Sequence, residues 1–149
     1  MLMIYGTCVA LSGLGVLLRG PSGSGKSDLA LRLIDGGARL VADDQIELTL
    51  DAAGRVMARA PKPLAGLLEV RGIGILPVDA VRASPVGLVV DLAADDRIER
   101  LPEVETCLLL DCPIRRVTLA PFHASTPAKV RLAAARLRAG ALEPVPDLP

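Results

Sequence analysis

The chain has 149 residues, with 17 basic and 17 acidic side chains, so its formal net charge is zero. Hydrophobic residues make up 51% of it, whereas aromatic residues make up only 1%. This composition excludes intrinsic disorder. It also argues against a broad nucleic-acid surface, because the chain has no surplus of cations and almost no aromatic side chains on which bases could stack. We expect one domain over residues 1–140 and a loose, proline-rich tail over residues 141–149.

Cysteine content and the apolar N-terminal segment both favour a cytoplasmic protein. Cys8, Cys107 and Cys112 are odd in number and predict reduced thiols rather than a disulfide framework. Met1–Leu18 is uncharged, but it lacks the basic start of an export signal and is interrupted by glycines. Neither secretion nor a membrane partner is therefore expected.

Short apolar runs predict a series of strands with helices between or after them. In chain order, the expected strands are Cys8–Leu11, Gly15–Arg19, Arg39–Ala42, Ile46–Leu50, Arg55–Ala60, Val86–Leu92 and Arg116–Leu119. The expected helices are Ser27–Ile34, ended by Gly36-Gly37, and Thr126–Leu137, with Thr126 as its N-cap and Gly140 as its end. This mixture predicts an α/β or mixed α+β class.

The most informative segment is a complete G-x-x-x-x-G-K-S pattern, Gly20-Pro21-Ser22-Gly23-Ser24-Gly25-Lys26-Ser27. Gly23 and Gly25 permit the backbone angles that turn consecutive N–H groups toward an anion, and the following helix adds its positive end. Lys26 would reach the β- and γ-phosphates, and the Ser27 hydroxyl would lie on Mg²⁺. An apolar strand precedes the loop and an amphipathic helix follows it, which favours nucleotide binding over a simple glycine-rich turn.

A phosphate loop by itself permits ATPase, GTPase, small-molecule kinase or protein kinase chemistry. The chain contains no asparagine and therefore lacks the Asn-Lys-x-Asp guanine reader of GTPases. ATP is accordingly the expected nucleotide.

Asp43 and Asp44 follow the apolar strand Arg39–Ala42 and are the first candidates for catalysis. Open α/β sheets place their ligands at the carboxyl ends of strands. Adjacent side chains in a strand point to opposite faces, so one carboxylate could face the metal and the other the core or the acceptor. The alternative is a pair of solvated turn residues.

Glu69 and Arg71 are isolated charges in the apolar run Leu67–Leu76. Their spacing of two predicts the same face of a strand, and burial there would require a partner or a ligand. The residues fit equally well a simple ion pair between Glu69 and Arg71 on an edge strand, without any role in a site.

The remaining candidates carry weaker signals. His123 is the only histidine, and a lone histidine is more often structural than catalytic. With Cys107 and Cys112 it does not form a convincing zinc spacing. The basic residues of the last helix predict a solvated face; they are Lys129, Arg131, Arg136 and Arg138.

Taken together, three runs resemble the catalytic domain of bacterial HPr kinase/phosphorylase. They are the phosphate loop, Leu40–Asp44 at the family's distance from it, and Leu68–Gly74, which looks like the family signature. The resemblance covers roughly Tyr5–Arg100 and matches the short, alphaproteobacterial-type form. It implies a phosphate-loop kinase core with a central sheet, similar to phosphoenolpyruvate carboxykinase, and an assembly of six copies.

Carried over by position, the resemblance implies a role for each matching residue. Lys26 and the loop would hold ATP, while Ser27 and Glu69 would hold Mg²⁺. Asp44, beside Asp43, would be the general base toward a seryl hydroxyl of HPr, a small phosphocarrier protein. Arg100 matches the family's catalytic arginine, with Arg97 as a substitute, and Arg71 lies in the stretch important for both phosphorylation and its reversal.

Two positions depart from the family's pattern. Tyr5 stands 21 residues before Lys26, where family members have a histidine, and a phenol does not replace an imidazole beside an aspartate. Ala120–Thr126 replaces the arginine- and glycine-bearing phosphorylase motif. We therefore expect kinase activity and doubt the phosphorylase. The alternatives are a nucleotide-binding regulatory module with weakened catalysis and a small-molecule kinase.

Overall fold

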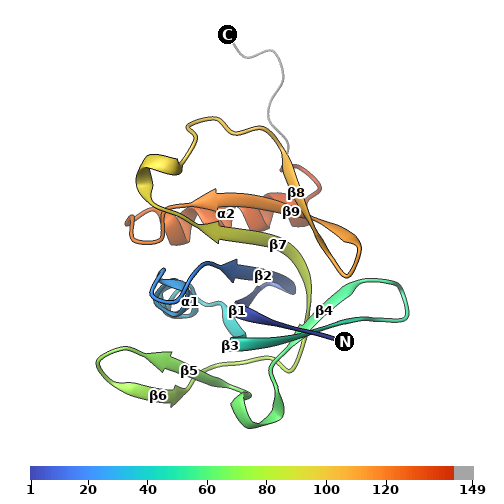
Figure 1. Cartoon of the computed structure of the whole chain (residues 1–149), viewed down its shortest axis with the longest axis vertical. Coiled ribbons are helices and arrows are strands. Elements are labelled where there is room, and N and C mark those ends of the chain that lie inside the picture. The colour runs from blue at the N-terminus through green and yellow to red at the C-terminus, as the bar shows by residue number, and fades with distance from the viewer. Residues whose placement is uncertain (143–149) are drawn as a thin grey trace.

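The computed structural model describes residues 1–142, which fold into one large sheet, a small hairpin and two helices (Figure 1). The strands of the large sheet are β1 (Leu2–Leu11), β2 (Leu14–Arg19), β3 (Arg39–Leu50), β4 (Val56–Arg59), β7 (Ser84–Leu92), β8 (Glu105–Leu109) and β9 (Cys112–Leu119). The hairpin consists of β5 (Leu67–Val70) and β6 (Gly74–Pro77), and the helices are α1 (Lys26–Asp35) and α2 (Thr126–Arg138). Two short 3₁₀ turns complete the fold, η1 (Lys62–Leu64) and η2 (Asp95–Arg97).

Five strands of the large sheet close into a ring. The strand order is β2-β1-β3-β4-β7-β9-β8, and β2 also pairs with β7 in parallel. Because β7 thus pairs with both β2 and β4, β2 is not left at an edge of the sheet. Consecutive side chains of a strand alternate between the inside and the outside of this ring.

The alternation creates two apolar cores. One lies within the ring and includes Leu17 and Val89. The other lies between the outer face of the sheet and both helices, and includes Leu18, Leu29 and Val130. Residues of β5 belong to the second core, so the hairpin is attached to the same face as the helices. The loop between β2 and α1 lies at the end of this helix-covered face (Figure 1).

The local predictions are confirmed for both helices, for the turn after Leu11 and for the hairpin that joins β3 to β4. The expected end of a strand at Asp43-Asp44 is wrong: β3 runs through both residues to Leu50. The backbone instead bends inside the strand, where Asp44 has φ 71°, in the left-handed region. Aspartate adopts this region more readily than most residues, so the strand can bend without ending.

Other expectations fail because side chains of α2 donate to backbone carbonyls outside that helix. Thr126 is the first helical residue rather than the cap, and its hydroxyl donates to the Ala120 carbonyl at 2.6 Å. Arg131 leaves the solvated face of α2 and donates to the Arg32 carbonyl of α1 at 3.0 Å. The strand β8 was not predicted at all.

All three cysteines are free, as expected, and burial raises the pKa of Cys8 to about 12. Within residues 1–142, no helix is long and apolar enough to cross a membrane. Residues 143–149 of the expected tail lie outside the described part.

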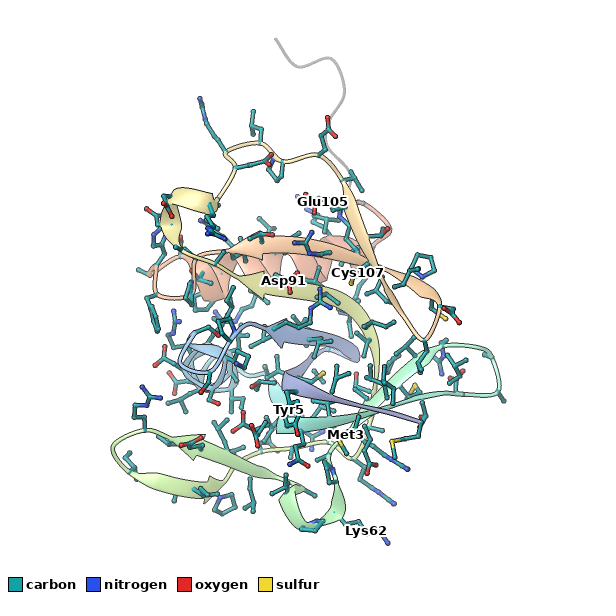
Figure 2. The ribbon with its side chains drawn as sticks, viewed as in Figure 1. Met3, Tyr5, Lys62, Asp91, Glu105 and Cys107 are labelled. Carbon is teal, nitrogen blue, oxygen red and sulfur yellow. The ribbon has the colours of Figure 1, made fainter. Side chains whose placement is uncertain are left out.

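A charge cluster fixes the strand that leads into the phosphate loop. Arg19, the last residue of β2, donates two hydrogen bonds to Asp91 of β7, at 2.8 and 2.9 Å. Arg116 of β9 donates to the same carboxylate and to Glu105 of β8 (Figure 2 labels Asp91 and Glu105). Burial by itself would raise the pKa of Asp91, but the hydrogen bonds from both arginines outweigh it and lower that pKa. The cluster thereby joins four strands immediately before Gly20.

Replacing Asp91 by asparagine (Asp91→Asn) tests this cluster. The substitution removes the charge that strengthens the bonds, so the free energy of unfolding at pH 7 should fall by about 1–3 kcal/mol. Because the carboxyl pKa is lower in the folded state, its stabilisation is complete above the unfolded-state pKa and is lost as the pH falls through the folded-state pKa. Urea denaturation should therefore show a large difference from the wild type at pH 7 and a smaller one below about pH 4. An equal difference at both pH values would contradict this assignment.

Candidate functional site

The loop between β2 and α1 has the backbone that the glycine spacing predicts. Gly23 and Gly25 have φ values of 81° and 96°, and the loop is closed by a hydrogen bond from the Ser24 N–H to the Pro21 carbonyl at 3.0 Å. The first turn of α1 follows directly and presents N–H groups that have no partner within the helix. Lys26 folds back over the loop and donates to the carbonyls of Gly20, at 2.6 Å, and Pro21, at 2.9 Å. A phosphate would offer this ammonium group a charged acceptor in place of two neutral ones.

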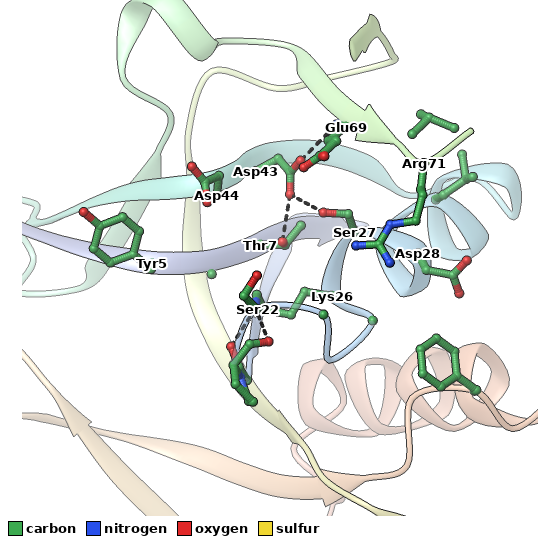
Figure 3. Close-up of a pocket in the computed structure, with 18 residues that line it drawn as sticks. Tyr5, Thr7, Ser22, Lys26, Ser27, Asp28, Asp43, Asp44, Glu69 and Arg71 are labelled. Carbon is green, nitrogen blue, oxygen red and sulfur yellow. Dashed lines mark hydrogen bonds between the residues drawn. The ribbon is translucent and has the colours of Figure 1, made fainter. Parts of the chain in front are cut away.

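The carboxylate of Asp43 connects the phosphate loop to two other parts of the chain (Figure 3). Its Oδ1 accepts hydrogen bonds from the hydroxyls of Thr7, at 2.9 Å, and Ser27, at 2.8 Å. Its Oδ2 accepts a hydrogen bond from the backbone N–H of Glu69 at 3.0 Å. Asp43 is only 7% exposed, and these three donors compensate for its burial. Since the Ser27 hydroxyl donates its hydrogen bond to Asp43, the lone pairs of its oxygen remain available to a cation.

Asp44 lies beside this cluster but remains exposed. Asp43 is buried and Asp44 is exposed, and both line one cavity of about 590 Å³. The left-handed backbone of Asp44 changes the direction in which its side chain leaves the strand. Strained backbone of this kind is often found at functional sites. Tyr5, on the neighbouring strand β1, lines the same cavity.

The cavity is acidic, with Asp28, Asp43, Asp44 and Glu69 facing Lys26 and Arg71. A polyphosphate would therefore enter most favourably together with a cation. The side-chain oxygens of Ser27 and Glu69 are hard donors that suit Mg²⁺. No group of three or more His, Cys, Asp or Glu side chains in residues 1–142 is arranged to hold a metal. A Mg²⁺ ion usually takes one or two protein ligands and completes its shell with phosphates and water.

Most of the residues predicted from the sequence line this cavity, including Asp43, Asp44, Glu69, Arg71 and the loop apart from Ser24. Glu69 and Arg71 are both exposed, and the expectation that they share one face of a strand is wrong, because Arg71 lies in the turn after β5. In the described part of the chain the two residues form no ion pair.

The structure does not bring every predicted residue into the cavity. Arg100 is exposed in the segment after η2 and does not line it, whereas Arg97 and Ser24 line a second cavity. His123 contacts Asp95, with 3.0 Å between Nε2 and Oδ1. Thr7, Asp28 and Phe122 also line the first cavity and were missed. Thr7 is a fully buried polar residue in an apolar run, which is a signal that could have been noticed, but Phe122 reaches the loop from a distant segment.

A phosphate loop at a helix N-terminus, with a carboxylate that accepts a hydrogen bond from its serine, is the geometry of a phosphate-loop fold that binds nucleotides. The family model described as "HPr Serine kinase C-terminal domain" matches residues 1–120. The chain belongs to this family.

Individual relatives agree with this membership. The chain is 42% identical over 127 residues to the HPr kinase/phosphorylase of Bordetella pertussis, with 78% of this chain and 41% of that protein covered. It is 39% identical over 127 residues to the protein of that name from Latilactobacillus sakei, with the same shares covered. The chain therefore spans about two fifths of the length of these relatives. A solved structure, the Hpr(Ser) kinase/phosphatase from Coxiella burnetii, superimposes with a TM-score of 0.83 at 25% identity, covering 94% of this chain and 92% of that one.

The variant Gly25→Ala tests the loop. A Cβ at this position would lie 2.8 Å from the Phe122 ring, and alanine would have to adopt a φ of 96°, which residues other than glycine rarely do. Gly54→Ala is the matched control. Gly54 lies in the turn between β3 and β4 and also has a positive φ, 79°, but a Cβ there would have no atom within 4 Å. Both variants should lose about 1–2 kcal/mol of stability from backbone strain. Only Gly25→Ala should weaken the binding of Mg-ATP in calorimetry, by about tenfold or more. Equal ATP binding by both variants would contradict the assignment.

Proposed function

We propose that the chain is an ATP-dependent protein serine kinase that phosphorylates an HPr-type phosphocarrier protein. The observation that carries this proposal is the Asp43 carboxylate, which connects the phosphate loop, the Asp43-Asp44 strand and the Glu69 hairpin around one cavity. These are the three runs on which the family resemblance was based. The names of the relatives, each an HPr kinase/phosphorylase or HPr(Ser) kinase/phosphatase, support the same acceptor.

Four parts of the cavity have separate roles in this proposal. The loop amides and Lys26 bind the phosphates of ATP. Ser27 and Glu69 would hold Mg²⁺, which when bound offsets the charge of the β- and γ-phosphates. Asp44 accepts the proton of the seryl hydroxyl as that oxygen bonds to the γ-phosphorus, and ADP leaves with the electrons of the broken P–O bond. Arg71 provides the positive charge that the transferring group needs, because Arg100 lies outside the cavity.

The assignment of the base to Asp44 follows from the hydrogen bonds. Asp43 is buried and its two oxygens already accept three hydrogen bonds, so its role is to position Ser27 and the hairpin. Asp44 is exposed to the cavity through which an acceptor would approach. A general base must reach the proton it removes, and only Asp44 of this pair is accessible.

We infer kinase activity without the phosphorylase. The segment Ala120–Thr126, which stands where the family has its phosphorylase motif, begins where the family model stops matching. Here Pro121 and Phe122 lie against the phosphate loop, and Thr126 is bonded to the Ala120 carbonyl. A cytoplasmic location and a homohexamer, the latter as the resemblance implies, are part of the same proposal.

A regulatory nucleotide-binding module is the second candidate, and Tyr5 is the observation that favours it. The ring is 74% exposed at the cavity, at the position of the family's histidine. A phenol there does not exchange a proton with a carboxylate near neutral pH as an imidazole does.

Transfer of labelled phosphate from ATP to the organism's HPr separates the two candidates, and Asp44→Asn tests the base. This variant should lose about 100-fold or more of its transfer rate, because general-base catalysis contributes about 10²–10⁴-fold. Its affinity for Mg-ATP should change by no more than about threefold, since Asp44 does not form the loop. Asp111→Asn, in the exposed turn between β8 and β9, is the matched control and should retain full activity. Unchanged transfer by Asp44→Asn would refute the assigned base, and ATP binding without transfer by the wild type would support the regulatory module.

Restoring the family's residue with Tyr5→His tests the role of the substituted position. If the missing imidazole limits the reaction, kcat should rise by about tenfold, and its pH profile should gain a limb near the pKa of histidine, about 6.5. Tyr5→Phe is the control, because it removes the hydroxyl without adding an imidazole. An unchanged kcat and pH profile would show that the position does not limit turnover.

A further inference from the structure

A second cavity lies on the other side of the phosphate loop. Its volume is about 560 Å³, and it shares Pro21 and Phe122 with the cavity that contains the aspartates. Ser24, the loop residue that does not face the first cavity, lines the second one. A ligand held by the loop could therefore extend into both cavities.

The walls of the second cavity are mainly apolar. Leu92, Ala93 and Ala94 at the end of β7 form one side, and the Ala120–Phe122 segment after β9 forms another. Phe122 is the only phenylalanine of the chain, and its side chain is 66% exposed although it lies beside Gly25. An exposed aromatic ring beside a phosphate loop offers a flat surface on which a base can stack.

A few polar groups complete the lining. The Ser24 hydroxyl oxygen is buried and has no hydrogen-bond partner within residues 1–142. The His123–Asp95 contact and Arg97 also line the cavity. An apolar pocket of roughly 300–1,000 Å³ with a small number of polar groups is typical of small-molecule sites.

We infer that this second cavity takes the adenosine part of the nucleotide, with the base stacked against Phe122. This inference rests on the proposed function and names the part of the same substrate that lies away from the reacting phosphate. The first cavity holds four carboxylates and must also admit the seryl acceptor, so it is a poor place for a neutral base. The second cavity is apolar, adjoins the loop and contains a hydroxyl that lacks a partner.

This inference is tested by calorimetry of the full chain with ATP and with inorganic tripolyphosphate, each in the presence of Mg²⁺. ATP and inorganic tripolyphosphate offer the loop a chain of three phosphates, but only ATP carries a nucleoside. Stacking of one base contributes about 1–3 kcal/mol, so the wild type should bind ATP at least about tenfold more tightly than tripolyphosphate. Phe122→Ala removes the stacking surface and Ala94→Trp fills the cavity from its exposed wall. Each should weaken ATP binding by about tenfold and change tripolyphosphate binding by less than about twofold.

Leu132→Ala is the matched control, because Leu132 is 60% exposed on α2 and does not line the cavity. It should change neither affinity. Tripolyphosphate binding at wild-type strength also shows that a variant has folded. The inference is overturned if wild-type ATP and tripolyphosphate bind equally, if both variants bind ATP normally, or if both variants lose the two ligands together. In each of these cases, binding of the two ligands by the wild type still supports the assignment of the phosphate loop. A wild type that binds neither ATP nor tripolyphosphate overturns the proposed function as well.

Discussion

The buried carboxylate of Asp43 is the interaction on which the site depends. Its three hydrogen bonds come from β1, α1 and β5, which are separated by up to 62 residues between Thr7 and Glu69. A carboxylate this buried is stable only while its donors remain in place. The position of Ser27 therefore depends on the whole sheet. The Arg19–Asp91 pair fixes the other end of the same loop.

Local features of the site could be predicted from the sequence. The phosphate loop, the strand before it and the helix after it are specified within about twenty consecutive residues by glycine positions and apolar periodicity. The three runs could also be assigned to one site, because the family pattern places them there. The bend at Asp44 could not be predicted, since an apolar run followed by two acidic residues is typical of a strand end.

Features that depend on contacts between distant parts of the chain could not be predicted from local sequence patterns. Closure of the ring requires β7 to pair with β2 and β4 together, and no local pattern specifies this. Phe122 and Thr7 belong to the site only because segments far apart in the chain meet beside the loop. Arg100 is a different case: its position in the family's pattern was matched, but it does not line the cavity, and its catalytic role stays a prediction.

The proposed phosphoryl transfer gives the two aspartates different roles, and this division is the central claim. A crystal structure with Mg²⁺ and a non-hydrolysable ATP analogue tests it most directly. We expect the phosphates on the loop amides, Lys26 moved from the Gly20 and Pro21 carbonyls to a phosphate, Asp43 still bonded to Ser27, and Asp44 directed at the γ-phosphate. Phosphates bound elsewhere, or Asp44 directed away from them, would contradict the account.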